Sequence, residues 1–448
     1  MLHANNKKVK ELLLKGEFGL EKESLRIDEK GFLSHTEHPF KRNKYIVRDF
    51  CENQVEINTP VFKSVREAVE HLDRLNRQIQ SKLAGLSVRE YIWPFSNPPY
   101  IRNEEDIPIA KFSKRQSKKT TYREYLSDRY GRYKMSLSGV HVNYSFDDEL
   151  LRADFAVSGE KDFEEYKNQL YVMLAEKAAA YGWLLVAVTA ASPLMDGSFV
   201  EKKRYDEDNF NGMASVRCSE LGYWNFFAPI FDYSDIRSYA DSIKQYVEDG
   251  WIKYPSELYY PIRLKPAGEN NLESLRDNGV NHIELRMFDL NPFISCGVEE
   301  KDVIFAQLLL VWLASTKRKP LTTKDQIQAV QNFKNAAHYD LKTVKIVIPN
   351  DGTYSVTDAA LKVISLMKEF YSDFSDDIHR ILEFEEAKFI EQSNRYSWKV
   401  RQLFGGNFVK RGLELAKRRQ EEAVNGNLSD CVTICTSIHS KTGCMAEG

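Results

Sequence analysis

Two strand-like segments carry acidic residues at spacings that could bring their carboxylates together. In GLEKES, Glu21 and Glu23 stand two residues apart, so on a strand both carboxylates project from the same face. In DFCENQVEINTP, Asp49 and Glu56 flank a second segment, in which Glu56 alternates with apolar residues. A single pair of acids is more often a solvated strand face than a metal site. Carboxylates gathered from two neighbouring strands, however, would bind hard divalent cations.

Two later segments place further polar groups opposite apolar rows. His141 and Asn143 share one face of MSLSGVHVNYSF, and Glu284 and Arg286 share one face of NHIELRMFDLNPF. Several carboxylates with one imidazole are the ligand chemistry of Mg²⁺ or Mn²⁺, whereas Zn²⁺ would favour cysteine and more histidine. Without the neighbouring acids, we would interpret His141 as a core histidine. With them, the sequence favours a magnesium or manganese site.

A sheet is needed to bring these residues together, and the sequence contains the alternation typical of strands. This alternation marks residues 16–27, 49–58, 134–146 and 281–288. Helical periodicity marks residues 65–83, 162–189, 301–316, 359–370, 376–394 and 409–423. The pattern predicts an α+β fold, in which an antiparallel sheet packs one face on helices and leaves the other open to ligand.

The composition indicates a globular protein with a small-molecule partner. The chain has 448 residues, of which 42% are hydrophobic, and 63 basic residues balance 65 acidic ones. Because no charge of one sign dominates, we expect no nucleic-acid partner and no membrane partner. The first residues lack the apolar region of a signal peptide, and the longest apolar stretches are too short to span a bilayer. We therefore expect a cytoplasmic protein, with no oligomeric state specified by the sequence.

Seven motifs along the chain resemble, in the same order, the blocks of bacterial glutamate-cysteine ligase. These motifs are FGLEKESLRI, RDFCENQVEINTP, YIWPFSNPP, YREYLSDRYG, SLSGVHVNYS, VRCSELGYWN and HIELRMFDLNPF. They look most like the ligase portion of bifunctional glutathione-synthesising enzymes. The resemblance runs from about Gly16 to about Val298, and the rest of the chain matches only in its helical character.

The resemblance implies a fold and a set of site residues. The implied fold is glutamine-synthetase-like: a curved antiparallel sheet forms a funnel surrounded by helices, and ATP and the amino acids enter from opposite ends. The residues that match the family's metal ligands are Glu21, Glu23, Asp49, Glu56, His141 and Glu284. The residues that match its phosphoryl-transfer arginines and its cysteine pocket are Arg217, Arg286, Tyr122 and Tyr223. Outside these motifs, such arginines and tyrosines would be interpreted as surface ion pairs and ordinary packing.

The implied reaction is the ATP-dependent joining of the γ-carboxylate of glutamate to the amine of cysteine, with Mg²⁺ or Mn²⁺. ATP is a substrate, and no P-loop or Rossmann signature is present to bind it. One alternative is a related ligase that attaches glutamate to another amine, since the metal and ATP residues would be the same. A second is a catalytically inactive regulatory homologue, which the intact acidic set argues against.

We expect residues 1–424 to form one catalytic ligase domain, mainly helical from about residue 300, because no linker rich in Pro, Gly or Ser interrupts the first 300 residues. Residues 425–448 are predicted to be a flexible tail. Its Cys431, Cys435, His439 and Cys444 could be drawn as a metal site, but the spacing is not CxxC, and plain or redox-sensitive thiols are favoured. Since the sequence ends without the ATP-grasp portion of the bifunctional enzymes, we expect only the first peptide-like bond.

Overall fold

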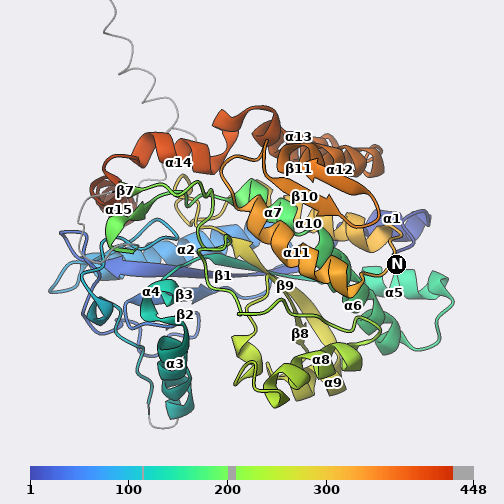
Figure 1. The fold of residues 1–448 in the computed structure, drawn as a ribbon, viewed down its shortest axis with the longest axis horizontal. Helices are drawn as coiled ribbons and strands as arrows, with labels where there is room; N and C mark the ends of the chain where they lie inside the picture. The colour runs from blue at the N-terminus through green and yellow to red at the C-terminus, as the bar shows by residue number, and fades with distance from the viewer. Residues whose placement is uncertain (114–115, 200–207, 427–448) are drawn as a thin grey trace, which may run out of the picture.

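The computed structural model describes residues 1–113, 116–199 and 208–426, and at its centre is one antiparallel sheet (Figure 1). The strand order is β2-β3-β1-β5-β9-β8, and β4 pairs with the end of β1. These strands are β1 (Gly16–Ile27), β2 (Ile46–Arg48), β3 (Gln54–Asn58), β4 (Tyr91–Ile92), β5 (Val140–Phe146), β8 (Ile262–Pro266) and β9 (Val280–Phe288). The α+β class and the antiparallel sheet predicted from the sequence are therefore confirmed.

Helices account for most of the remaining regular structure. The α-helices are α1 (Lys7–Leu12), α2 (Val65–Ala84), α3 (Ser117–Tyr130), α4 (Arg132–Met135), α5 (Asp148–Ser158), α6 (Phe163–Tyr181), α7 (Trp183–Thr189), α8 (Ile236–Glu248), α9 (Leu272–Asn278), α10 (Glu300–Ser315), α11 (Thr323–Ala336), α12 (Val356–Phe370), α13 (Asp376–Ile390), α14 (Tyr396–Phe404) and α15 (Phe408–Asn425). Short 3-10 helices are η1 (Glu104–Asp106), η3 (Gly197–Phe199), η4 (Pro255–Glu257) and η5 (Gln392–Asn394). Two small two-stranded sheets pair β6 (Met195–Asp196) with β7 (Asp208–Asn209) and β10 (Lys345–Ile348) with β11 (Gly352–Ser355).

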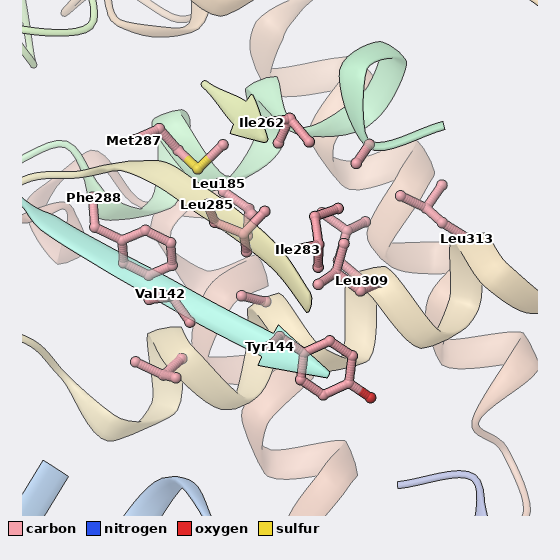
Figure 2. Packing of buried hydrophobic residues seen from close by; sticks show 14 of the residues in the cluster. Val142, Tyr144, Leu185, Ile262, Ile283, Leu285, Met287, Phe288, Leu309 and Leu313 are labelled. Carbon is pink, nitrogen blue, oxygen red and sulfur yellow. The ribbon is translucent and has the colours of Figure 1, made fainter. Parts of the chain in front are cut away.

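The core lies between the apolar face of the sheet and the long helices. Val142 on β5 and Ile283 and Leu285 on β9 are buried, as their alternation with polar residues predicts. Figure 2 shows Leu185 of α7 and Leu309 of α10 packed near these strands. Each fully buried aliphatic side chain of this kind contributes about 1.5–3 kcal/mol. This packing fixes which face of each strand is left for polar residues.

Four predicted elements differ from those in the structure. The predicted strand 134–146 begins only at Val140, because the residues before it form α4 and a turn that bonds to Ser96. The predicted strand 49–58 is shortened to β3, since residues 49–53 form the turn after β2. The predicted helix 162–189 divides at Gly182, where a Cβ would lie 2.8 Å from the Phe333 ring of α11. The predicted helix 376–394 is also shorter in the structure, where α13 ends at Ile390.

Among the described residues, no single helix is long and apolar enough to cross a membrane. Only α6 and α7 taken together, across their bend of 56°, reach that length and composition. The tail residues Cys431, Cys435, His439 and Cys444 lie outside the described ranges. The cysteines within those ranges, Cys51, Cys218 and Cys296, are all buried and form no disulfide.

Candidate active site

Three neighbouring strand pairs align polar residues across the sheet. Glu23 of β1 lies opposite Glu56 of β3, and Glu21 of β1 lies opposite His141 of β5. On the other side of β5, Asn143 lies opposite Glu284 of β9. Because side chains alternate along each strand, the helix-facing residues of these segments are apolar except Lys22, whose Nζ donates to Asn76 of α2 at 2.7 Å. The register therefore gathers these residues into one row, hereafter the carboxylate row.

His141 lies at the centre of the carboxylate row. Its Nδ1 lies 3.0 Å from Glu21 Oε2 and 3.8 Å from Glu284 Oε1, and its Nε2 lies 3.8 Å from Glu23 Oε1. Asn143 Nδ2 donates a hydrogen bond of 3.0 Å to the other oxygen of Glu21. Glu21, His141 and Glu284 each offer one ligand atom, and these atoms lie within 4.8 Å of one another. Such a spacing lets one cation contact all three.

The β3 end of the row holds carboxylates with little compensating charge. Burial, and then the charge of Asp49, raise the pKa of Glu23. Burial raises the pKa of Glu56 well above its ordinary value, and the charges of Asp49, Glu21 and Glu23 add to this effect. Asp49 itself follows β2, is partly exposed, and has its carboxylate 3.8 Å from the Arg123 guanidinium. The structure thus brings all four of these acids close together.

The β9 end of the row is rich in cations. Arg286 Nη1 lies 3.1 Å from Glu284 Oε2, and Lys265 Nζ of β8 lies 3.3 Å from Glu284 Oε1. Burial would raise the pKa of Glu284, but Arg286, Lys265 and His141 outweigh it and hold that pKa far below the ordinary range. Arg263 of β8 lies opposite Glu284 in the strand register, and burial and then the charge of Arg286 lower its pKa. Sequence analysis missed Arg263 and Lys265, although their two-residue spacing in PIRLKP matches that of Glu21 and Glu23.

Arg217 reaches the site from an irregular segment. It is 7% exposed, and its Nη1 donates to the backbone oxygens of Arg286 and Phe288 at 3.0 and 2.9 Å. The guanidinium lies against Gly139, where a Cβ would come within 2.3 Å of the Arg217 Cζ. The backbone N–H of Gly139 in turn donates to Glu23 Oε2 at 3.1 Å. The glycine of SLSGVHV is therefore what allows Arg217 to approach the carboxylate row.

The two predicted tyrosines line a cluster of aromatic rings beside the arginines. Tyr223 packs edge-on against Tyr259 with 4.9 Å between ring centroids, and Tyr122 packs against Tyr254 at 5.1 Å. A cavity of about 50 Å³ is lined by Tyr223, Tyr259 and both arginines, among other residues. This is room for a small group. Tyr122 does not line this cavity, although its phenol is close enough to contribute to the raised pKa of Tyr259, after burial.

A larger cavity, of about 1240 Å³, lies elsewhere, between α6, α11 and the segment after α10. None of the predicted site residues lines it. Its charged groups are of both signs and include Lys177, whose Nζ donates to the backbone oxygen of Leu313 at 3.0 Å. The larger cavity and the carboxylate row are therefore separate places in the fold.

The residues of the carboxylate row fit a magnesium or manganese ion. The donors are carboxylate oxygens and one imidazole, the set that hard cations accept. Because a carboxylate only accepts hydrogen bonds, the contact with Glu21 requires the proton on His141 Nδ1, and a neutral imidazole then offers the lone pair of Nε2 to a metal. Among the described residues, this buried Nε2 has no hydrogen-bond partner. Added positive charge would also relieve the repulsion that raises the pKa of Glu56.

Comparisons with known proteins point to one family. A family model described as glutamate-cysteine ligase matches residues 2–256 and 228–336. The glutathione biosynthesis bifunctional protein GshAB of Clostridium perfringens is 34% identical over 396 residues, which cover 84% of this chain and 50% of that protein. GshAB of Listeria monocytogenes is 33% identical over 433 residues, covering 93% and 56%. The chain thus spans about half the length of the curated relatives it matches.

Solved structures agree with this result at the level of the fold. Glutamate–cysteine ligase of Francisella tularensis, in complex with AMP, superposes with a TM-score of 0.83 at 22% identity, covering 95% of this chain and 91% of that one. A bifunctional glutathione synthetase from Pasteurella multocida gives a TM-score of 0.81 at 24% identity, covering 94% and 54%. At such identities the two structures establish the fold alone. Since the family model matches most of the chain, the chain belongs to the glutamate-cysteine ligase family.

Proposed function

We propose that this chain joins the γ-carboxylate of glutamate to the amine of cysteine, converting ATP to ADP and phosphate. The product is γ-glutamylcysteine, formed through a γ-glutamyl phosphate, and the reaction is the first step of glutathione biosynthesis. The observation that carries the proposal is the meeting of the carboxylate row with two arginines on one face of the sheet. This meeting occurs in a chain of the glutamate-cysteine ligase family.

The residues that would hold Mg²⁺ or Mn²⁺ are Glu21, Glu23, Asp49, Glu56, His141 and Glu284. When bound, the ions supply positive charge for the triphosphate and for the transferring phosphoryl group. The two ends of the row differ in how much positive charge lies beside their carboxylates. Glu284 already has Arg286 and Lys265 beside it, whereas Glu23 and Glu56 keep raised pKa values. The Glu56 end is therefore the part of the row that gains most from added cations.

Arg217 and Arg286 stabilise the charge on the phosphoryl oxygens during transfer. Both guanidinium groups are held before substrate arrives: Arg286 by the Glu284 carboxylate, and Arg217 by two backbone oxygens. Donors fixed in this way cost no reorganisation during the reaction, which is why they can contribute strongly in a buried site. In this step an oxygen of the glutamate γ-carboxylate bonds to the γ-phosphorus of ATP, and the bond to ADP breaks.

The second step needs an amine held close to the acyl phosphate. The amine nitrogen of cysteine bonds to the carbonyl carbon, the bond from that carbon to the phosphate oxygen breaks, and one amine proton is released. Tyr122 and Tyr223 belong to the aromatic cluster, which we assign to the cysteine substrate. The cavity of about 50 Å³ beside Tyr223 suits a small side chain such as that of cysteine. Because Arg217 and Arg286 also line this cavity, the amine of a cysteine bound there would lie close to the activated carboxylate.

The proposal extends to the organisation and the surroundings of the protein. Residues 1–424 act as one catalytic unit, which is supported by the packing of α15, near the end of the chain, on α2 and β4. The partners are glutamate, cysteine and ATP, with no nucleic acid and no membrane. A cytoplasmic location follows from this reaction, because ATP and reduced cysteine are both available there.

An assay of ADP release tests the proposal with purified wild-type protein. Glutamate, ATP and Mg²⁺ are held at saturation while cysteine, 2-aminobutyrate or serine is varied as the acceptor. We expect the highest kcat/KM for cysteine, tolerance of 2-aminobutyrate, and poor use of serine, whose hydroxyl must lose water on entering a partly apolar cavity. A different best acceptor would overturn the choice of cysteine, and ADP release that no amine stimulates would overturn the ligase proposal.

A further inference from the structure

Glu257 is a fully buried carboxylate that the proposed mechanism does not use. It ends η4 and is 0% exposed. Tyr125 and Tyr130 donate hydrogen bonds to it through their hydroxyls, at 2.9 and 2.8 Å. The backbone N–H of Lys253 donates at 2.7 Å, and Arg129 Nε lies 2.8 Å from Glu257 Oε1. A buried charge of this kind is stable only because it is so fully bonded.

The side-chain donors to Glu257 all come from the C-terminal half of α3. Leu126 is the one buried residue of this helix, so its polar bonds contribute much to its position. Figure 1 shows α3 at the lower left, projecting away from the long helices that form the core. A second bond from the same turn joins Arg129 Nη2 to the backbone oxygen of Trp251 at 2.6 Å. The Glu257 carboxylate is therefore the polar anchor of the C-terminal half of α3.

The anchored helix carries two side chains toward the candidate active site. Tyr122 packs on Tyr254, next to η4, and Arg123 lies 3.8 Å from the Asp49 carboxylate. Since α3 has no wide apolar face, the bonds at its C-terminal end act together with the bond from Arg123 to the Asp49 backbone oxygen to position Tyr122 and Arg123.

The chain that follows Glu257 forms the opposite wall of the aromatic cluster. Tyr259, two residues later, packs against Tyr223 at 4.9 Å and against Tyr130 of α3 at 5.2 Å. Asn225 ties the same segment down, since it donates to the Glu257 backbone oxygen at 3.0 Å and accepts from Tyr259 N at 2.7 Å. One carboxylate therefore joins the helix that carries Tyr122 to the segment that carries Tyr259.

The chemistry at this anchor requires a carboxylate. All four groups donate to Glu257, and two of them, the Lys253 N–H and the Arg129 guanidinium, can only donate, so the NH2 group of a glutamine could not accept the bonds that the carboxylate accepts. Burial, and then the bond to Glu257, raise the pKa of Tyr125 to about 12, so this phenol remains a donor at neutral pH. Replacing Glu257 by Gln conserves shape but removes the match of charge and hydrogen bonds.

We infer that Glu257 is a positioning residue for the acceptor amine: it fixes α3 and so sets the distance between Tyr122 and the Tyr223–Tyr259 wall. This inference rests on the proposed function, because it assigns the aromatic cluster to the acceptor. Glu257 touches neither the carboxylate row nor the two arginines, so its effect falls on the acceptor and not on ATP or glutamate.

The test compares Glu257→Gln with Glu385→Gln in the full chain. Glu385 is an equally buried carboxylate on α13, lies 2.7 Å from Lys388 Nζ, and belongs to the helices far from α3 in Figure 1. In Glu257→Gln we expect KM for cysteine to rise about tenfold, while kcat and the KM values for ATP and glutamate stay within about twofold. In Glu385→Gln all four constants should stay near those of the wild type.

Amide hydrogen exchange gives a second readout that does not depend on activity. The amides of α3 should exchange faster in Glu257→Gln than in wild type or in Glu385→Gln, because the anchor is lost. Unchanged exchange in α3, or equal rises in the KM of all three substrates, would overturn the inference. If Glu257→Gln does not fold, Tyr130→Phe removes a single donor and should raise KM for cysteine in the same direction by a smaller factor. Absence of cysteine-dependent turnover in the wild type would instead count against the proposed function, and the exchange result would still decide whether Glu257 anchors α3.

Discussion

Replacing Gly139 by Ala is the sharpest test of how Arg217 is placed. The new Cβ would lie 2.3 Å from Arg217 Cζ and 2.5 Å from its Nη2. Carbon and nitrogen atoms in contact are about 3.5 Å apart, so the guanidinium must move by about 1 Å or more. That movement breaks its bonds to the backbone oxygens of Arg286 and Phe288. The substitution therefore displaces a positively charged donor without removing it.

The size of the effect follows from the role of a fixed donor. Loss of one such donor, or a misplacement of about 1 Å, lowers turnover by about 10²-fold in other sites. We therefore expect Gly139→Ala to lower kcat by about 10²-fold, equivalent to about 2.7 kcal/mol in the activation free energy. The melting temperature should fall only modestly, because the side chains of the apolar face are unchanged.

Steady-state ADP release and thermal unfolding are measured together for this variant. Gly85→Ala is the matched control, since a Cβ there would meet nothing closer than 3.8 Å. If Gly139 acts through Arg217, then adding Gly139→Ala to Arg217→Ala should cost little more than Arg217→Ala alone. Near-normal turnover in Gly139→Ala, or a full additional loss in the double variant, would refute this reasoning.

Three further predictions concern metal binding, phosphoryl transfer and stability. Glu21→Gln should lower turnover by about 10²-fold and raise the Mg²⁺ concentration needed for half-maximal activity. Wild-type turnover at the Mg²⁺ concentration that serves the wild type would remove Glu21 from the ligand set. Arg286→Lys should lower kcat more than it weakens ATP binding in titrations, because lysine lacks the planar fork, and equal losses would point to ground-state binding. Lys22 is buried, which lowers its pKa from 10.5 to about 8, so the unfolded chain binds its proton more tightly. Wild-type stability relative to Lys22→Met should thus rise by about 2 kcal/mol between about pH 7 and pH 9.5 in denaturant titrations, and a constant difference would contradict the low pKa.

The sheet and the carboxylate row could be predicted because both rest on alternation. In β5 and β9, one face packs on helices, so apolar residues alternate with polar residues that share the other face, whereas β1 also places Lys22 on the helix side. The spacing of Glu21 and Glu23 therefore predicted a shared face before any pairing was known. The pairing of Glu23 with Glu56, and of Glu21 with His141, is a long-range property that no local pattern specifies.

Residues in irregular segments could not be placed from periodicity. Arg217 lies outside any regular element, so only the resemblance to a family indicated its role. Lys265 was missed because β8 has five residues and follows an apolar run that hides its alternation. Glu257 is a single acid in a short 3-10 helix, and its importance appears only when α3 folds back onto it. The close approach of Phe333 to Gly182, where the predicted helix divides, is likewise a contact between residues distant in sequence.

In the proposed mechanism, the γ-carboxylate of glutamate is phosphorylated before the amine of cysteine attacks. Glutamate labelled with ¹⁸O in its γ-carboxylate tests this directly, with mass spectrometry of the phosphate released in the presence of cysteine and ATP. If the γ-glutamyl phosphate forms, the carboxylate oxygen bonded to phosphorus leaves with it, and each phosphate carries one ¹⁸O. Phosphate without ¹⁸O, released while γ-glutamylcysteine accumulates, would contradict the mechanism.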